Sequence, residues 1–207
     1  MTPAGLILAG GRGSRMGGAV PKPLVPLAGR PLILHVVARL ERQAAPLILA
    51  APAGAGYDHL NLPLAPDHRP GLPGPLAGIE AGLQALSVMG TAGPDRLFVT
   101  PGDTPFLPVD IVERLASTDL DKPVAAVHAG RIQPATAMWP LTVLPDLERW
   151  LDEGRPLAIR AFLEAIGHVV AEIPATADAP AGDPFFNVNT PDDLSLAEAF
   201  LRRQHGA

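Results

Sequence analysis

Short apolar runs that stop at glycine or proline alternate with stretches of helical periodicity through the first half of the chain. The first run, Gly5 to Ala9, ends in Gly10-Gly11 and has the length and boundaries of a buried strand. The pattern predicts strands over Gly5–Ala9, Pro46–Ala51 and Arg96–Thr100, a candidate short strand over Leu62–Leu64, and helices over Pro31–Gln43, Gly78–Met89 and Val109–Leu115. Alternation of strands and helices indicates a parallel sheet with helices on both faces.

The second half of the chain is less regular. Val124–His128 and Ala135–Trp139 are predicted as strands on either side of a turn at Gly130, as in a hairpin. Further predictions are helices over Leu141–Leu151, Ala158–Ala165 and Pro191–Arg203, and strands over Val169–Ile173 and Phe185–Val188. We therefore expect an α/β fold, a three-layer sandwich around a mostly parallel sheet.

Composition narrows the class of protein. With 207 residues, 47% of them hydrophobic, we expect one domain over 1–207, with an N-terminal half of about 1–117 and a C-terminal half of about 118–207. The absence of cysteine excludes disulfides, thiolate zinc sites and cysteine catalysis. A net charge of −5 argues against nucleic acid as a partner. The longest uncharged stretch is too short to span a membrane, and the N-terminus does not resemble a signal peptide, so we expect a cytoplasmic protein.

The first predicted strand leads into the glycine-rich run Leu8-Ala-Gly-Gly-Arg-Gly-Ser-Arg-Met-Gly-Gly18. Such a loop places backbone N–H groups at the carboxyl end of a parallel sheet, where phosphates bind. Arg12 and Arg15 lie in it, and Lys22 follows as one of only two lysines among 16 basic residues. The composition fits either an oligophosphate cradle or a tight turn with solvated cations.

Three later motifs add candidate chemistry. Asp103 follows the strand Arg96–Thr100, at the same sheet edge as the glycine loop, and a carboxylate there can hold Mg²⁺ beside phosphates. The run Gly74-Pro-Leu-Ala-Gly78 either allows the backbone to approach a flat ring or simply starts a helix. Asn187 and Asn189 alternate along a predicted strand and would project to one face, whereas Thr190 and Asp193 fit a helix cap.

Taken together and in this order, four motifs resemble those of the molybdenum cofactor guanylyltransferase (MobA) family. They are Leu8-Ala-Gly-Gly with Arg15 and Lys22, Gly74-Pro-Leu-Ala-Gly78, Asp103-Thr-Pro-Phe, and Asn187-Val-Asn-Thr-Pro191. The resemblance covers residues 5 to 194 and implies a Rossmann-like, GT-A-like nucleotidyltransferase fold. It implies transfer of GMP from GTP to molybdopterin carrying molybdenum, with Mg²⁺ as cofactor and release of pyrophosphate. It also suggests partners among molybdenum-inserting or molybdoenzyme-maturation proteins.

The resemblance also implies the roles of single residues. Arg15, Lys22 and Asp103 would be catalytic, and Asp103 would be the metal ligand. Asn187 and Asn189 would bind the acceptor. Nucleotide binding would fall on Leu8, Ala9, Gly10, Gly11, Lys22, Asp67, Gly74, Pro75, Leu76, Ala77, Gly78 and Asp103.

Two stretches depart from the family pattern. Val20-Pro21-Lys22-Pro23 is closer to sugar-phosphate nucleotidylyltransferases, and Ala50-Ala51-Pro52 lacks the asparagines that the family carries after the second strand. One alternative is therefore a cytidylyl- or uridylyltransferase that acts on a pterin or sugar phosphate. Another is a non-catalytic nucleotide-binding regulator.

Overall fold

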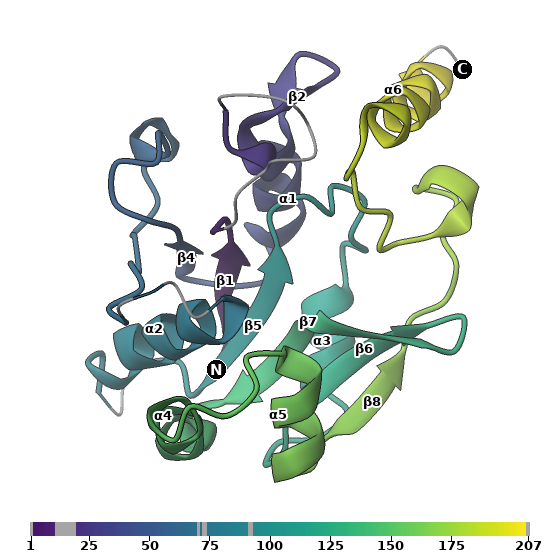
Figure 1. Ribbon diagram of the computed structural model, residues 1–207. Coiled ribbons are helices and arrows are strands. Elements are labelled where there is room, and N and C mark those ends of the chain that lie inside the picture. The colour runs from purple at the N-terminus through teal and green to yellow at the C-terminus, as the bar shows by residue number, and fades with distance from the viewer. Residues whose placement is uncertain (1, 11–19, 70, 72–73, 91–92, 206–207) are drawn as a thin grey trace.

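A twisted sheet runs through the centre of the molecule (Figure 1). The structure is a computed structural model that describes residues 2–10, 20–69, 71, 74–90 and 93–205. Within these residues the sheet has six strands in the order β4-β1-β5-β7-β6-β8. They are β1 (Ala4–Leu8), β4 (Leu47–Ala50), β5 (Arg96–Pro101), β6 (Val124–His128), β7 (Arg131–Pro140) and β8 (Val169–Glu172). Only β7 runs antiparallel to its neighbours, which confirms the prediction of a mostly parallel sheet.

Helices cover both faces of this sheet. Alternating side chains of the strands enter two separate cores: Leu6 and Val99 face one, and Ile7 and Phe98 face the other, all of them fully buried. The first core is completed by α2 (Pro75–Ser87), α4 (Leu144–Asp152) and α5 (Ile159–Ile166), and the second by α1 (Leu32–Leu40) and α3 (Ile111–Ala116). The predicted three-layer sandwich is confirmed.

A third, smaller core lies beyond the carboxyl ends of the strands, at the top of Figure 1. There α6 (Pro191–His205) packs near the hairpin of β2 (Pro26–Leu27) and β3 (Arg30–Pro31). The shared core includes Leu27, Leu32, Phe106 and Val188. The hairpin is absent from the sequence predictions, because its strands have only two residues each. No helix among the described residues is long and apolar enough to cross a membrane.

Helix α2 lies unusually close to the sheet. A Cβ atom built at Gly82 would come within 2.7 Å of Leu6 Cδ2 and 2.9 Å of Leu97 Cδ2, so any larger residue there would have to displace these two buried side chains. The helix begins at Pro75, not at the predicted Gly78, because proline suits the first helical turn. The motif Gly74–Gly78 therefore forms the start of α2 and is not a loop before it.

One predicted strand is wrong. Residues 185–188 form no strand, because the N–H of Val188 donates to the Asp103 carbonyl (3.2 Å) in a loop and has no strand partner. At Leu62–Leu64 the structure has a single bridge between Leu49 and Leu64. The other predicted elements are confirmed with shifted ends, and short 3₁₀ helices are added: η2 (Lys22–Leu24), η3 (Asp58–Leu60), η4 (Leu141–Val143), which precedes α4, and η5 (Pro180–Gly182).

Candidate active site

The candidate site lies where β1 and β5 are neighbours. From β1 the chain passes through α1 to β4 on one side, and β5 lies on the other side, so the connections diverge between the two strands. Ligands of parallel α/β sheets bind at such a switch point, outside the carboxyl ends of the strands. The N–H of Gly102 donates to the Leu8 carbonyl (2.9 Å) and joins the two strand ends. The ends of β1 and β5 therefore bring Leu8 to Gly10 close to the loop that carries Asp103.

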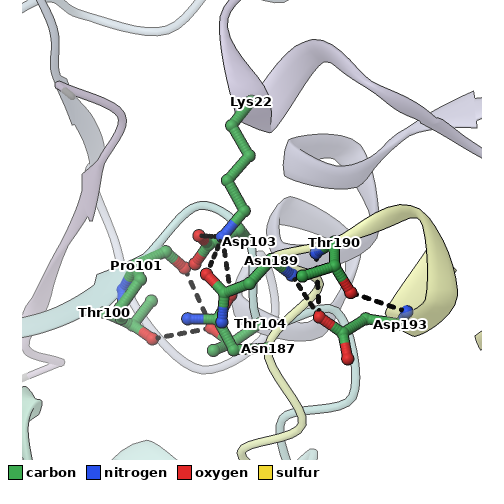
Figure 2. Close-up of polar contacts among 9 residues, drawn as sticks. All are labelled: Lys22, Thr100, Pro101, Asp103, Thr104, Asn187, Asn189, Thr190 and Asp193. Carbon is green, nitrogen blue, oxygen red and sulfur yellow. Dashed lines mark hydrogen bonds and ion pairs between the residues drawn. The ribbon is translucent and has the colours of Figure 1, made fainter. Parts of the chain in front are cut away.

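Lys22 is the centre of a polar cluster at this edge (Figure 2). Its ammonium forms an ion pair with Asp103 Oδ2 and donates to Asn187 Oδ1 (2.9 Å) and Asn189 Oδ1 (2.5 Å). The three N–H bonds of the ammonium thus have three acceptors. The fold brings together residues that are 81 to 167 positions apart in the sequence.

Asp103 retains one unused oxygen. Its side chain is 15% exposed, and Oδ1 is buried without a hydrogen-bond partner in the described part of the chain. A buried carboxylate oxygen without a donor is costly unless a cation or donor reaches it. The described residues contain no cluster of three metal-ligating side chains. Mg²⁺ is commonly held by one or two carboxylates together with substrate phosphates, so the residues present fit this ion.

Lys22 is held by local structure. It lies in η2 between Pro21 and Pro23, and the N–H of Val25 donates to its carbonyl (3.0 Å). Pro23 is buried against Gly102, where a Cβ atom would come within 3.3 Å of Pro23 Cβ. Prolines on both sides restrict the backbone dihedral angles around Lys22, so the position and direction of its Cα–Cβ bond are restricted as well.

Asn189 is held by the start of α6. Asp193 Oδ2 accepts hydrogen bonds from the N–H groups of Asn189 (2.9 Å) and Thr190 (2.8 Å), and Thr190 Oγ1 accepts one from the Asp193 N–H (3.2 Å). This is the reciprocal capping box that the sequence predicts. Burial acts to raise the pKa of Asp193, but these hydrogen bonds outweigh it and keep the pKa below its ordinary value. The same box therefore caps α6 and orients Asn189.

The carboxyl end of β1 has a support that the sequence prediction missed. Tyr57, the only tyrosine of the chain, is buried and donates from its hydroxyl to the Ala9 carbonyl (3.2 Å). Burial raises the pKa of Tyr57 to about 12, so the hydroxyl stays a donor at neutral pH. A lone aromatic residue in an irregular segment was the only sequence signal for it. Gly11 and Arg15 of the predicted glycine loop lie outside the described residues.

A group of threonine hydroxyls beneath Asp103 was also missed. Thr100 Oγ1 lies 3.4 Å from both Thr104 Oγ1 and Thr136 Oγ1, and the Thr104 hydroxyl donates to the Pro101 carbonyl (2.9 Å). All three side chains are buried, and Figure 2 shows Thr100 and Thr104 beside the loop of Asp103. They satisfy the polar groups of this turn inside the core.

The other predicted nucleotide contacts lie apart from Lys22. Asp67 Oδ1 accepts the Arg69 N–H (2.8 Å), and Asp67 has no polar contact with Lys22 or Asp103 in the described structure. In the Gly74–Gly78 motif, Leu76 and Ala77 are buried, whereas Gly74 and Pro75 are exposed. A Cβ atom at Gly78 would lie 3.1 Å from Leu8 Cδ2 and 3.2 Å from Ala50 Cβ, so this glycine serves the packing of α2 on the sheet. Gly74 has a φ of +83°, which favours glycine.

The mostly parallel sheet, with Lys22 and Asp103 at its switch point, is that of a nucleotidyltransferase domain. The chain belongs to the family of MobA-like NTP transferase domains, whose model matches residues 5–170. It is 38% identical to a molybdenum cofactor guanylyltransferase of Cereibacter sphaeroides, over 96% of this chain and 97% of that protein. It is 39% identical to one of Mesorhizobium japonicum, over 96% of each chain.

Solved structures share the fold. Molybdopterin-guanine dinucleotide biosynthesis protein A from Archaeoglobus fulgidus is 24% identical with a TM-score of 0.75, and the match covers 97% of this chain and 99% of that one. The 2-C-methyl-D-erythritol 4-phosphate cytidylyltransferase of Thermus thermophilus is 21% identical with a TM-score of 0.66, over 98% and 100% of the two chains. The architecture is thus common to proteins whose names specify different nucleotides.

Proposed function

We propose that this chain transfers GMP from GTP to molybdopterin carrying molybdenum and releases pyrophosphate, in biosynthesis of the guanine dinucleotide form of the molybdenum cofactor. The observation that carries the proposal is the contact of Lys22 with Asp103 at the carboxyl edge of the sheet, with Asp103 Oδ1 left unpartnered. Relatives at 38% and 39% identity bear the name molybdenum cofactor guanylyltransferase, which supports the choice of nucleotide and acceptor.

The proposed roles follow the positions of the residues. The backbone of Leu8, Ala9, Gly10 and Gly11, together with Arg15 and Lys22, would hold the triphosphate. Asp67 and the start of α2, Gly74 to Gly78, would hold the nucleoside, and Asn187 and Asn189 the phosphate of the acceptor. We place the reaction in the cytoplasm and expect proteins that insert molybdenum or mature molybdoenzymes as partners.

The chemistry requires positioning and neutralisation of charge. An oxygen of the acceptor's phosphate monoester forms a bond to the α-phosphorus of GTP, and the bond from that phosphorus to the bridging β-phosphate oxygen breaks. A phosphate monoester is already anionic at neutral pH, so no general base is needed. Lys22 stabilises the negative charge that accumulates on the leaving pyrophosphate. Asp103 would hold Mg²⁺, which neutralises phosphate charge when bound.

The two asparagines can act on both substrates. Their Oδ1 atoms accept hydrogen bonds from Lys22, and their Nδ2 groups donate to none of the described residues. A carboxamide that accepts on one side can donate to a phosphate oxygen on the other. Asn187 and Asn189 would thus orient the ammonium and bind the acceptor phosphate at the same time.

A transfer assay tests the proposal. Purified protein is incubated with Mg²⁺, molybdopterin and GTP labelled in its α-phosphate, and we expect label in a dinucleotide and release of pyrophosphate. Asp103→Asn should keep the fold, measured by circular dichroism, and lose roughly 10²–10³-fold in turnover, as when one electrostatic group is removed. Nucleotide binding without metal should persist in that variant. Full activity of Asp103→Asn would contradict the metal role.

Parallel reactions with CTP and UTP test the competing functions. Preferred transfer from CTP or UTP would identify a cytidylyl- or uridylyltransferase. Nucleotide binding without release of pyrophosphate, with pterin and sugar phosphates as acceptors, would identify a non-catalytic regulator. The contact of Lys22 with Asp103 favours catalysis over regulation. It places a cation that can stabilise phosphate charge beside a carboxylate that can hold a metal ion, and phosphoryl transfer uses both.

A further inference from the structure

Arg69 lies in a segment that backbone hydrogen bonds do not hold. The segment between β4 and α2 first pairs with the sheet, where the Ala65 N–H donates to the Leu49 carbonyl (2.9 Å). After Ala65, the described residues 66–69 and 71 take part in no hydrogen bond between backbone groups. Side-chain contacts therefore hold residues 66–69 in place.

The guanidinium of Arg69 attaches this segment to two helices. Its Nε and Nη2 donate to the two carboxylate oxygens of Glu80 in α2 (2.7 and 2.5 Å), and Nη1 donates to Asp152 Oδ1 at the end of α4 (2.8 Å). Glu80 is only 5% exposed. The hydrogen bonds to Glu80 first, and to Asp152 second, raise the pKa of Arg69 above its ordinary value. A paired, forked contact of this kind fixes both position and orientation.

The backbone of Arg69 in turn orients Asp67. The Arg69 N–H donates to Asp67 Oδ1 (2.8 Å), whereas Asp67 Oδ2 accepts no hydrogen bond from the described residues. Asp67 is half-buried, and Oδ2 together with the second lone pair of Oδ1 can accept two adjacent donors of a ligand. The segment follows β4 at the same sheet edge as the end of β1, where the Ala9 N–H donates to the Ala50 carbonyl (2.9 Å).

We propose that Arg69 is a positioning residue for the nucleotide: it clamps the segment to α2 and α4 through Glu80 and so aims the Asp67 carboxylate at the base. The inference rests on the proposed function. The Watson–Crick edge of guanine offers adjacent N1–H and N2–H₂ donors, whereas that of cytosine offers only N4–H₂. A fixed carboxylate therefore favours guanine, and loosening it reduces the preference for GTP over CTP.

Calorimetric titration with GTP and CTP in the presence of Mg²⁺, without acceptor, tests this role. In Arg69→Met we expect the Kd for GTP to rise about tenfold, the size of one lost hydrogen bond, with a smaller change for CTP. Arg69→Lys should rescue only in part, because an ammonium lacks the fork that matches Glu80. Arg149→Met is the matched control: Arg149 also pairs with a carboxylate on α4, but the pair is exposed and does not touch the segment.

Because Arg69→Met leaves Glu80 buried without its partner, a second variant guards against loss of folding. Arg69→Met combined with Glu80→Leu removes both charges and should fold, while the Kd for GTP still rises. A merely structural role would lower the melting temperature of these variants without changing the ratio of the two nucleotide affinities. In an Asp67→Ala background, Arg69→Met should have little further effect on GTP binding, since it acts through that carboxylate.

Three outcomes would separate a failure of the role of Arg69 from a failure of the proposed function. Unchanged GTP affinity and selectivity in folded Arg69 variants would overturn the role of Arg69 and leave the proposed function intact. A full additive effect on top of Asp67→Ala would also overturn it. A wild-type protein that binds neither nucleotide would overturn the proposed function and the role of Arg69 together.

Discussion

Lys22 carries the positive charge of the polar cluster at the candidate site, and its surroundings favour a compact ammonium. Asp103, Asn187 and Asn189 approach one nitrogen atom from three sides, which a planar guanidinium could not satisfy in the same space. This geometry gives a physical reason for a lysine in a chain whose basic residues are otherwise 14 arginines and Lys122.

Lys22→Ala should lower kcat by roughly 10²–10³-fold and raise the KM for the nucleotide by less, because the charge matters most when pyrophosphate departs. Lys22→Arg should restore little activity. Steady-state kinetics of GMP transfer provide the measurement. Lys122 is exposed in the turn before β6, where its backbone N–H donates to Asp119 Oδ1 (2.9 Å); it is the control and should tolerate alanine. Equal tolerance of alanine at Lys22 and Lys122 would refute the assignment of the site.

At the scale of elements, the capping box of α6 connects helix stability to the site. Asp193 accepts the N–H groups of Asn189 and Thr190, and Asn189 in turn contacts Lys22. The helix therefore cannot lose its cap without loosening one of the three acceptors around the ammonium.

Asp193→Ala should destabilise the protein by about 0.5–2 kcal/mol, the usual effect of losing a cap, and should lower GMP transfer as well. Urea unfolding and the transfer assay measure the two effects. Asp192→Ala is the control, because Asp192 lies exposed in the same first turn and shares its charge but makes no capping contact. If Asp193→Ala reduced stability but left GMP transfer unchanged, the cap would have no part in orienting Asn189.

A comparison of the predicted with the observed helices and strands shows which elements a local sequence pattern can predict. Strands β1 and β6 and helix α6 followed from apolar runs, glycine boundaries and proline at the helix start. The false strand at Phe185–Val188 had the right composition, but its backbone bonds to the loop of Asp103. Strand propensity says nothing about whether a partner strand lies alongside, and here none does among the described residues.

At the scale of the molecule, the two halves share one sheet. Strand β7 of the second half lies between β5 and β6 and pairs with β5 from Arg96 to Val99. Trp139 of β7 is fully buried in the same core as α2. We therefore propose that residues 1–207 form one domain and that the halves near residue 117 do not fold separately.

A fragment of residues 1–117 should not show a cooperative unfolding transition, because removal of β7 leaves the edge of β5 unpaired and exposes Leu97 and Val99. Thermal unfolding followed by circular dichroism, with the full chain alongside, is the measurement. A sharp transition of the fragment at a melting temperature close to that of the full chain would show that the first half is an independent domain.

The sequence by itself determined the alternation of strands and helices and the positions of Lys22 and Asp103 after the first and third predicted strands, because these features depend on neighbours in the chain. The sequence motifs also identified the family, which the family model and the relatives confirm. Only the tertiary structure decided that Asn187 and Asn189 accept from Lys22, that Tyr57 supports Ala9, and that Arg69 clamps the segment of Asp67. Those contacts join residues far apart in sequence, and a hydrogen bond across such a separation depends on how the layers pack, which no local pattern encodes.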